Sequence, residues 1–166
     1  MKVRQASPED LPALIRLFEE LERMQRDWRV FTPRPGFYDE VASRFHLAFQ
    51  AHDRVVLVAE DDAEVVGMAY GEVRIPSRFS DERSLEISGV VVRSGYRGKG
   101  AGRALVEEGA RFAKEHDVGW IEVKSFWPNK PSMDFWSALG FTPRVVQLVA
   151  STEEAARLSH EEEATG

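Results

Sequence analysis

The chain has 166 residues, of which 43% are hydrophobic and 30% charged, a composition typical of a globular protein. Its 28 acidic and 22 basic side chains give a net charge of −6, which argues against non-specific binding to nucleic acid or to an anionic membrane surface. It has no cysteine and no apolar stretch that could span a bilayer, which excludes disulfides, thiolate metal sites and an acyl-cysteine intermediate and makes the cytoplasm the expected location.

The first third of the chain is expected to form one strand and two helices. "KVRQA" alternates as a short strand does, and Ser7 followed by Pro8 is typical of a helix start. Apolar residues then recur at helical spacing over residues 11–21. Residues 26–37 hold two prolines and a glycine and are expected to be a loop, and residues 38–52 a second amphipathic helix.

The remaining segments alternate between strands and helices. Residues 54–75 are typical of a β-hairpin around an acidic turn, and 84–92 of a further strand. A helix from about 101 to 116, a strand at 118–126, a short helix at 130–140 and a last strand at 144–150 are expected to follow. We therefore expect one α/β domain over residues 1–150, with about seven strands and four main helices, and a polar acidic tail over 151–166.

Residues 96–109, "YRGKGAGRALVEEG", place three glycines at alternate positions between a strand and a helix. Glycine there costs about 0.5–1 kcal/mol relative to alanine, so a ligand is expected to compensate. Free amides at a helix start favour an anion, above all a phosphate, and the basic residues of the segment add positive charge. The P-loop and the dinucleotide fingerprint both require other spacings. The alternative is a flexible loop before an ordinary helix.

Two segments resemble the GNAT superfamily of acyl-CoA-dependent N-acyltransferases. Arg97, Gly100 and Gly102 match its Arg/Gln-x-x-Gly-x-Gly/Ala motif. "NKPSMDFWSALGF" is similar to its Asn–helix–Phe-Tyr-x-x-x-Gly-Phe segment, and the order of elements over residues 1 to about 150 fits as well. The resemblance implies an α+β fold with a mixed, mostly antiparallel sheet that splays open beside the motif strand.

The same resemblance implies where acetyl-CoA would bind. Pantetheine would bond to the backbone around Val90 and Val92, and the Val90 amide would meet the acyl oxygen. Asn129 would contact the pantetheine arm. Trp136 stands where many members carry a tyrosine that protonates the departing thiolate; it would be a wall of the CoA tunnel or a core aromatic. The pyrophosphate would lie on the segment formed by Arg97, Gly98, Lys99, Gly100, Ala101, Gly102 and Arg103.

Glu86 is the candidate general base. An amine with a pKa near 10.4 arrives protonated at neutral pH, and a carboxylate can take its proton. Strand alternation predicts that Glu86, Ser88 and Val90 share one face, directed at the thioester. Glu86 also matches a base position of the histone-acetyltransferase branch of the family. The alternative is a solvated glutamate on an exposed surface.

The acceptor side is expected near the loop between the first two helices, which in the family usually borders the acceptor cleft. Trp28, Phe31 and Tyr38 could line it, with neighbouring arginines binding a carboxylate or phosphate; alternatively these aromatics pack the loop. The four histidines show no i, i+4 pairing, so no metal is expected.

The sequence thus predicts an N-acetyltransferase that moves an acetyl group from acetyl-CoA directly to a primary amine of a small molecule or peptide, through a ternary complex. Its partners would be these two substrates, with a homodimer as the family commonly forms. Two alternatives remain: a non-catalytic CoA-binding module with the same fold, and a binder of another phosphate ligand such as a nucleotide.

Overall fold

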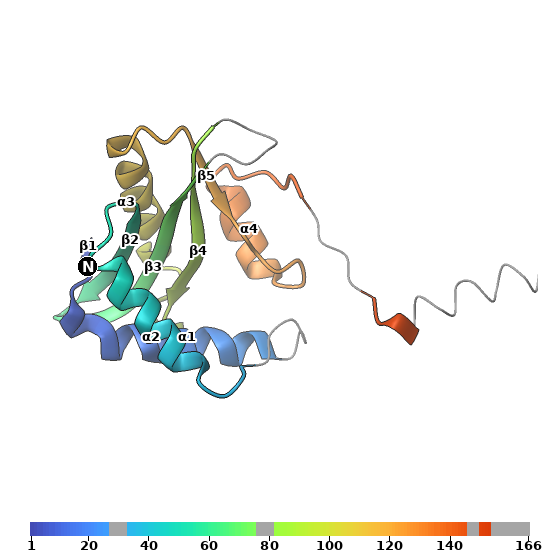
Figure 1. Cartoon of the computed structure of the whole chain (residues 1–166), viewed down its shortest axis with the longest axis horizontal. Helices are drawn as coiled ribbons and strands as arrows, with labels where there is room; N and C mark the ends of the chain where they lie inside the picture. Colours follow the sequence, from blue (N-terminus) through green and yellow to red (C-terminus); the bar gives the residue numbers. More distant parts are fainter. Residues whose placement is uncertain (27–32, 76–81, 146–149, 154–166) are drawn as a thin grey trace, which may run out of the picture. The chain divides into compact units, whose positions relative to one another are not determined.

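A computed structural model describes residues 1–26, 33–75, 82–145 and 150–153 (Figure 1). Within it the chain forms two compact units, Met1–Ser125 and Phe126–Gly166.

The first unit is built on a five-stranded sheet in the order β1-β2-β3-β4-β5. Its strands are β1 Lys2–Gln5, β2 Arg54–Asp61, β3 Glu64–Arg74, β4 Ser84–Val92 and β5 Trp120–Val123. The first three pairs are antiparallel and the last, β4 with β5, is parallel. The acidic turn between β2 and β3 places Asp62 and Ala63 at positive φ, as a tight hairpin requires.

Helices cover both faces of this sheet. The helix α1 (Leu11–Gln25), which follows a single 3₁₀ turn at Pro8–Asp10, and α2 (Phe37–Ala48) lie on one face. Their apolar stripes bury Leu14, Leu17 and Phe45 against Met68 and Tyr70 of β3. The helix α3 (Ala101–Glu115), preceded by a 3₁₀ turn at Ser94–Tyr96, lies on the other face and contacts β2, β3 and β4. The central strands β2 and β3 are buried over most of their length, which explains their long apolar runs.

The second unit contains α4 (Lys130–Ala138). Asn129 caps the helix, because its side-chain oxygen accepts a hydrogen bond from the Ser132 amide at 3.3 Å. After the helix the chain turns at Gly140, whose φ is +88°. Trp136 is buried, with its ring 4.9 Å from that of Phe135 and 5.0 Å from that of Phe141.

The predicted fold class is confirmed: the chain has a mixed α/β fold in which antiparallel pairs dominate, and its described residues form four main helices. About seven strands were expected, and the described residues hold five. Of the expected strand at 144–150, residues 146–149 lie outside the described part, as does 154–166 of the expected tail. The second helix begins one residue earlier than predicted and ends at Ala48.

Candidate functional site

Beside β5, the strand β4 changes from a paired strand to an open edge. Parallel pairing runs from Ser84 opposite Trp120 to Ile87 opposite Val123, where β5 ends. Because β4 continues to Val92, its last five residues have no strand partner on that side among the described residues. The sheet therefore opens beside the motif strand, and an extended ligand could add to this edge through backbone hydrogen bonds.

A register shift interrupts the pairing of β4 with β3 at the same place. Gly71 lies opposite Ile87 and Tyr70 opposite Gly89, so Ser88 has no partner on β3. An unpaired extra residue turns the side chains that follow it to the other face. Glu86 consequently shares a face with Gly89, on the side of α1 and α2.

The prediction that Glu86, Ser88 and Val90 share one face is therefore wrong. Val91, and not Val90, packs in the core under α1 and α2. A Cβ at Gly89 would lie 3.9 Å from Leu21 of α1. On the opposite face, Val92 and Leu105 of α3 both lie close to Gly67 of β3. Simple alternation fails because it assumes an uninterrupted ladder.

Residues 97–103, the glycine turn, run from the exposed segment 97–100 into the first turn of α3. Gly98 and Gly100 have φ values of +74° and +89°, a region in which side chains with a Cβ are strained. A Cβ added at either position would meet no protein atom within 4 Å, so the space in front of both is open. Gly100 is the N-cap of α3, whose first amides have no acceptor within the helix. The turn thus combines accessible N–H groups with the positive end of the helix dipole.

The side chain of Arg97, at the start of the glycine turn, contacts two neighbouring elements. Arg97 Nε donates to the Val92 carbonyl at 2.8 Å, and its Nη2 lies 3.1 Å from a carboxylate oxygen of Glu20 on α1. The same carboxylate oxygen accepts from the Ser94 amide at 3.2 Å. Arg97 thereby ties the end of β4 and the turn to α1. Its side chain holds the turn in place, and the turn offers a ligand its backbone.

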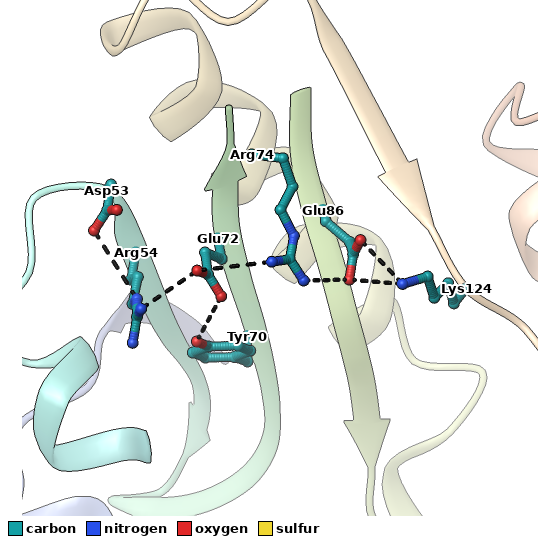
Figure 2. Close-up of polar contacts among 7 residues, drawn as sticks. All are labelled: Asp53, Arg54, Tyr70, Glu72, Arg74, Glu86 and Lys124. Carbon is teal, nitrogen blue, oxygen red and sulfur yellow. Dashed lines mark hydrogen bonds and ion pairs between the residues drawn. The ribbon is translucent and has the colours of Figure 1, made fainter. Parts of the chain in front are cut away.

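On the α1 and α2 face, six charged side chains alternate in sign across the sheet (Figure 2). This charge row consists of Asp53, Arg54, Glu72, Arg74, Glu86 and Lys124. Glu72 and Glu86 are direct cross-strand neighbours, an arrangement of like charges that is unfavourable without intervening cations. Arg74 lies between them, and Tyr70 from the adjacent core lies 3.5 Å from Glu72.

Glu86 is held between two cations of the charge row, Arg74 and Lys124. One of its oxygens lies 3.0 Å from Arg74 Nη2, and both lie 3.2 Å from Lys124 Nζ. Its side chain is 12% exposed, whereas that of Lys124 is 79% exposed. Burial raises the pKa of Glu86, but the hydrogen bonds and charges of Arg74 and Lys124 outweigh it and hold the pKa below its ordinary value. The group is therefore a carboxylate at neutral pH, able to accept a proton.

Near the end of α1, the predicted acceptor residue Tyr38 meets a buried carboxylate. The Tyr38 hydroxyl lies 3.5 Å from Glu22, whose side chain is buried and also bonds to Arg26 at 3.1 Å. Burial and the charge of Glu22 raise the pKa of Tyr38. The two other predicted acceptor residues, Trp28 and Phe31, lie outside the described residues.

The structure thus places most predicted donor residues on two adjoining features, the open edge of β4 and the glycine turn. Asn129 and Trp136 belong to the second unit, where the first caps α4 and the second is buried among aromatic rings. Sequence reasoning missed Arg74 and Lys124, the partners of Glu86. Only the register between strands could have indicated them, since Arg74 is 12 positions and Lys124 is 38 positions from Glu86 in the sequence.

Two kinds of feature are absent from the described residues. They contain no group of three or more histidine, aspartate or glutamate side chains arranged to hold a metal ion. No helix in the described parts of the chain is both long and apolar enough to cross a bilayer.

Comparison with known proteins gives a consistent set of relatives. The model of the acetyltransferase (GNAT) family matches residues 17–141. An uncharacterised N-acetyltransferase from Archaeoglobus fulgidus is 28% identical over 117 residues, which cover 70% of this chain and 76% of the relative. A streptothricin acetyltransferase from Streptomyces lavendulae is 31% identical over 93 residues, 55% of this chain and 46% of the relative. Among solved structures, an aminoglycoside N-acetyltransferase in complex with CoA is similar in fold, with a TM-score of 0.73, 18% identity and coverage of 91% and 94% of the two chains.

Proposed function

The chain belongs to the acetyltransferase (GNAT) family, and on that premise we propose that it moves an acetyl group from acetyl-CoA directly to a primary amine of a small molecule or peptide, within a ternary complex. One observation carries this proposal: the open edge of β4 leads directly to the glycine turn. Near the start of the same strand lies Glu86, a carboxylate in an ion pair with Lys124. Residues 1–150 would form the acyltransferase domain.

The residues present fit the chemistry of a CoA ester. The edge of β4 from Ser88 to Val92 offers backbone groups to the amide-bearing pantetheine arm, and the Val92 carbonyl already accepts one hydrogen bond, from Arg97. The positive φ of Gly98 and Gly100, with open space where a Cβ would stand, suits the approach of a pyrophosphate to the amides of residues 97–103. Bound acetyl-CoA would supply the acetyl group as an activated thioester.

Glu86 would remove the proton from the acceptor ammonium. Because Arg74 and Lys124 keep it ionised, it is ready to accept a proton at neutral pH. A carboxylate whose pKa is lowered is a weaker base, but its charge also attracts the ammonium and stabilises it next to the donor. Arg74 positions the carboxylate from the neighbouring strand.

The remaining roles follow from the family pattern. The amide of Val90 would meet the charge that develops on the acyl oxygen. Trp136 is a poor general acid, because an indole N–H donates a hydrogen bond but hardly releases its proton. A thiol of pKa near 8.5 is a fair leaving group without such help, so turnover does not depend on it. Trp136 and Asn129 would contact the CoA arm.

The acceptor is proposed to be an amine for two reasons. Two of the similar proteins are named N-acetyltransferases, one of them of an aminoglycoside, and another is named a streptothricin acetyltransferase. The carboxylates Glu86 and Glu22 are both on the α1 and α2 side of the unit and both suit a cationic ligand. Tyr38 would border the acceptor, with Trp28 and Phe31.

The proposal is tested by measuring release of the CoA thiol from acetyl-CoA in the presence of an amine panel. The panel holds an aminoglycoside, a lysine peptide and a short diamine, and the acetylated products are identified by mass spectrometry. We expect amine-dependent release, with initial-rate patterns that intersect as a ternary complex requires. Binding of CoA with no release for any amine would instead support the non-catalytic CoA-binding module.

A further inference from the structure

Lys124 occupies a position that a substrate amine would need. It follows β5 directly, one residue beyond the last β4–β5 pair, where the open edge of β4 begins. Its Nζ lies 3.2 Å from each carboxylate oxygen of Glu86. Figure 2 shows this ammonium at the outer end of the charge row. The chain therefore holds a primary amine of its own against the proposed base.

The ion pair with Glu86 leaves the amine of Lys124 accessible from solvent. The Lys124 side chain is 79% exposed, whereas Glu86 is largely buried and held from the other side by Arg74. Here the base is fixed and the amine is on a long chain at the surface, so the Nζ can leave Glu86 and return without disturbing the strand.

We propose that the protein acetylates its own Lys124. The inference rests on the proposed function, because it uses the same donor and the same base. Glu86 takes one proton from the Lys124 ammonium, and the nitrogen lone pair forms a bond to the acetyl carbon while the carbon–sulfur bond breaks. The sulfur leaves as the CoA thiolate and is protonated to the thiol, and the second ammonium proton goes to water. The products are N-acetyl-Lys124, CoA and one released proton.

Self-acetylation would change the acceptor side in a defined way. The amide of acetyl-Lys124 is neutral and cannot form the ion pair that the ammonium forms with Glu86. Glu86 would then keep Arg74 as its cationic partner, and an incoming cationic amine would no longer compete with Lys124 for the carboxylate.

Lys130 provides a matched control within the chain. Its Nζ also pairs with both oxygens of a carboxylate, Asp134 at 2.9 Å, and its side chain is 82% exposed. The two lysines are thus alike in exposure and in pairing with both oxygens of a carboxylate, whereas their carboxylates differ: Glu86 is the largely buried proposed base, and Asp134 is an exposed residue of the same helix as Lys130. Chemical acetylation by a thioester in solution would modify both to a similar extent.

The experiment incubates the full-length protein with isotope-labelled acetyl-CoA and no acceptor, and follows each lysine by peptide mass spectrometry. We expect one label on Lys124, formed at least about tenfold faster than on Lys130, at a rate constant independent of protein concentration. Glu86→Gln should slow labelling of Lys124 about 100-fold and leave Lys130 unchanged. Asp134→Asn should leave both rates unchanged, and Lys124→Arg should abolish the label at that position.

Each contrary result has its own meaning. If Lys124 stays unlabelled in a preparation that acetylates the amine panel, self-acetylation is refuted and the proposed function stands. Equal labelling of Lys124 and Lys130, or an unchanged rate in a Glu86→Gln variant with a native melting temperature, also refutes it, because the base is then not involved. A rate proportional to protein concentration refutes transfer within one molecule. Labelling of Lys124 without turnover of any panel amine would support self-acetylation and contradict the proposed acceptor class.

Discussion

The open edge of β4 has the charge row before its first residue, through Glu86, and the glycine turn after its last. The two features differ in the groups that a ligand would meet. The glycine turn presents backbone amides, and its one well-bonded side chain, Arg97, points away to Val92 and Glu20. The charge row presents side chains, each held by its neighbours on adjacent strands. The donor would thus be bound by main-chain groups and the acceptor by side-chain charge.

This difference predicts how the two regions respond to mutation and to evolution. A backbone site depends on local conformation, so it tolerates changes of most side chains but not of Gly98 or Gly100. A side-chain site depends on which residues the register brings together, so it can be altered one charge at a time. Members of one family can therefore keep the donor and exchange the acceptor. Three substitutions test this contrast, and their expected effects differ in size.

The largest effect is expected for Glu86→Gln. The amide keeps the shape of the side chain but cannot take a proton, so kcat should fall by about 100-fold or more while CoA affinity stays unchanged. Steady-state kinetics with the best panel amine and calorimetry with CoA measure the two quantities. An unchanged rate at both neutral and high pH would show that Glu86 is not the base.

The next effect is expected for Gly100→Val, with Gly95→Val as the control. At a φ of +89° a β-branched residue costs about 1–3 kcal/mol of backbone strain, and its side chain enters the open space before the amides. CoA affinity should fall by about tenfold or more in calorimetry. Gly95 lies in the preceding 3₁₀ turn, where φ is ordinary and a Cβ would also meet nothing, so that variant should bind normally.

Normal CoA binding by the Gly100→Val protein would remove the case for a backbone cradle. Weak binding by both variants would instead indicate that the whole segment tolerates no added side chain, and the contrast between the two glycines would be lost.

The smallest effect is expected for Arg74→Met, and it concerns pH. Arg74 helps to lower the pKa of Glu86, so its removal should raise that pKa. Because the base works only when deprotonated, the acid limb of the kcat/KM profile should move to higher pH, and the rate near neutral pH should change little. A profile that does not move, or moves to lower pH, would contradict the positioning role of Arg74.

The residues of the donor site could be predicted from the sequence because they are contiguous. Residues 97–103 carry the motif, and the family resemblance that they indicated is confirmed. The helices could also be predicted, since apolar stripes and helix-start residues are local features of the sequence. The predicted contacts of the donor residues with CoA stay predictions.

The side-chain contacts on the acceptor side could not be predicted from the sequence, because they depend on the register between strands. The contacts of Glu86 with Arg74 and Lys124 require the pairing of β3, β4 and β5, which no local pattern records. The face of Val90 was predicted wrongly because one unpaired residue, Ser88, has no signature in an apolar strand sequence. Trp28 and Phe31 stay predictions.

The unpaired Ser88 gives β4 one residue more than β3 at a single point. Deleting this residue would restore a regular ladder and keep the existing pairs, with Glu86 opposite Glu72 and Val91 opposite Met68. The deletion would remove only the bulge, together with the local bend and added twist that an extra residue gives a strand. A substitution at 88 keeps the bulge, whereas a deletion would straighten β4 at the point where its edge beside β5 opens.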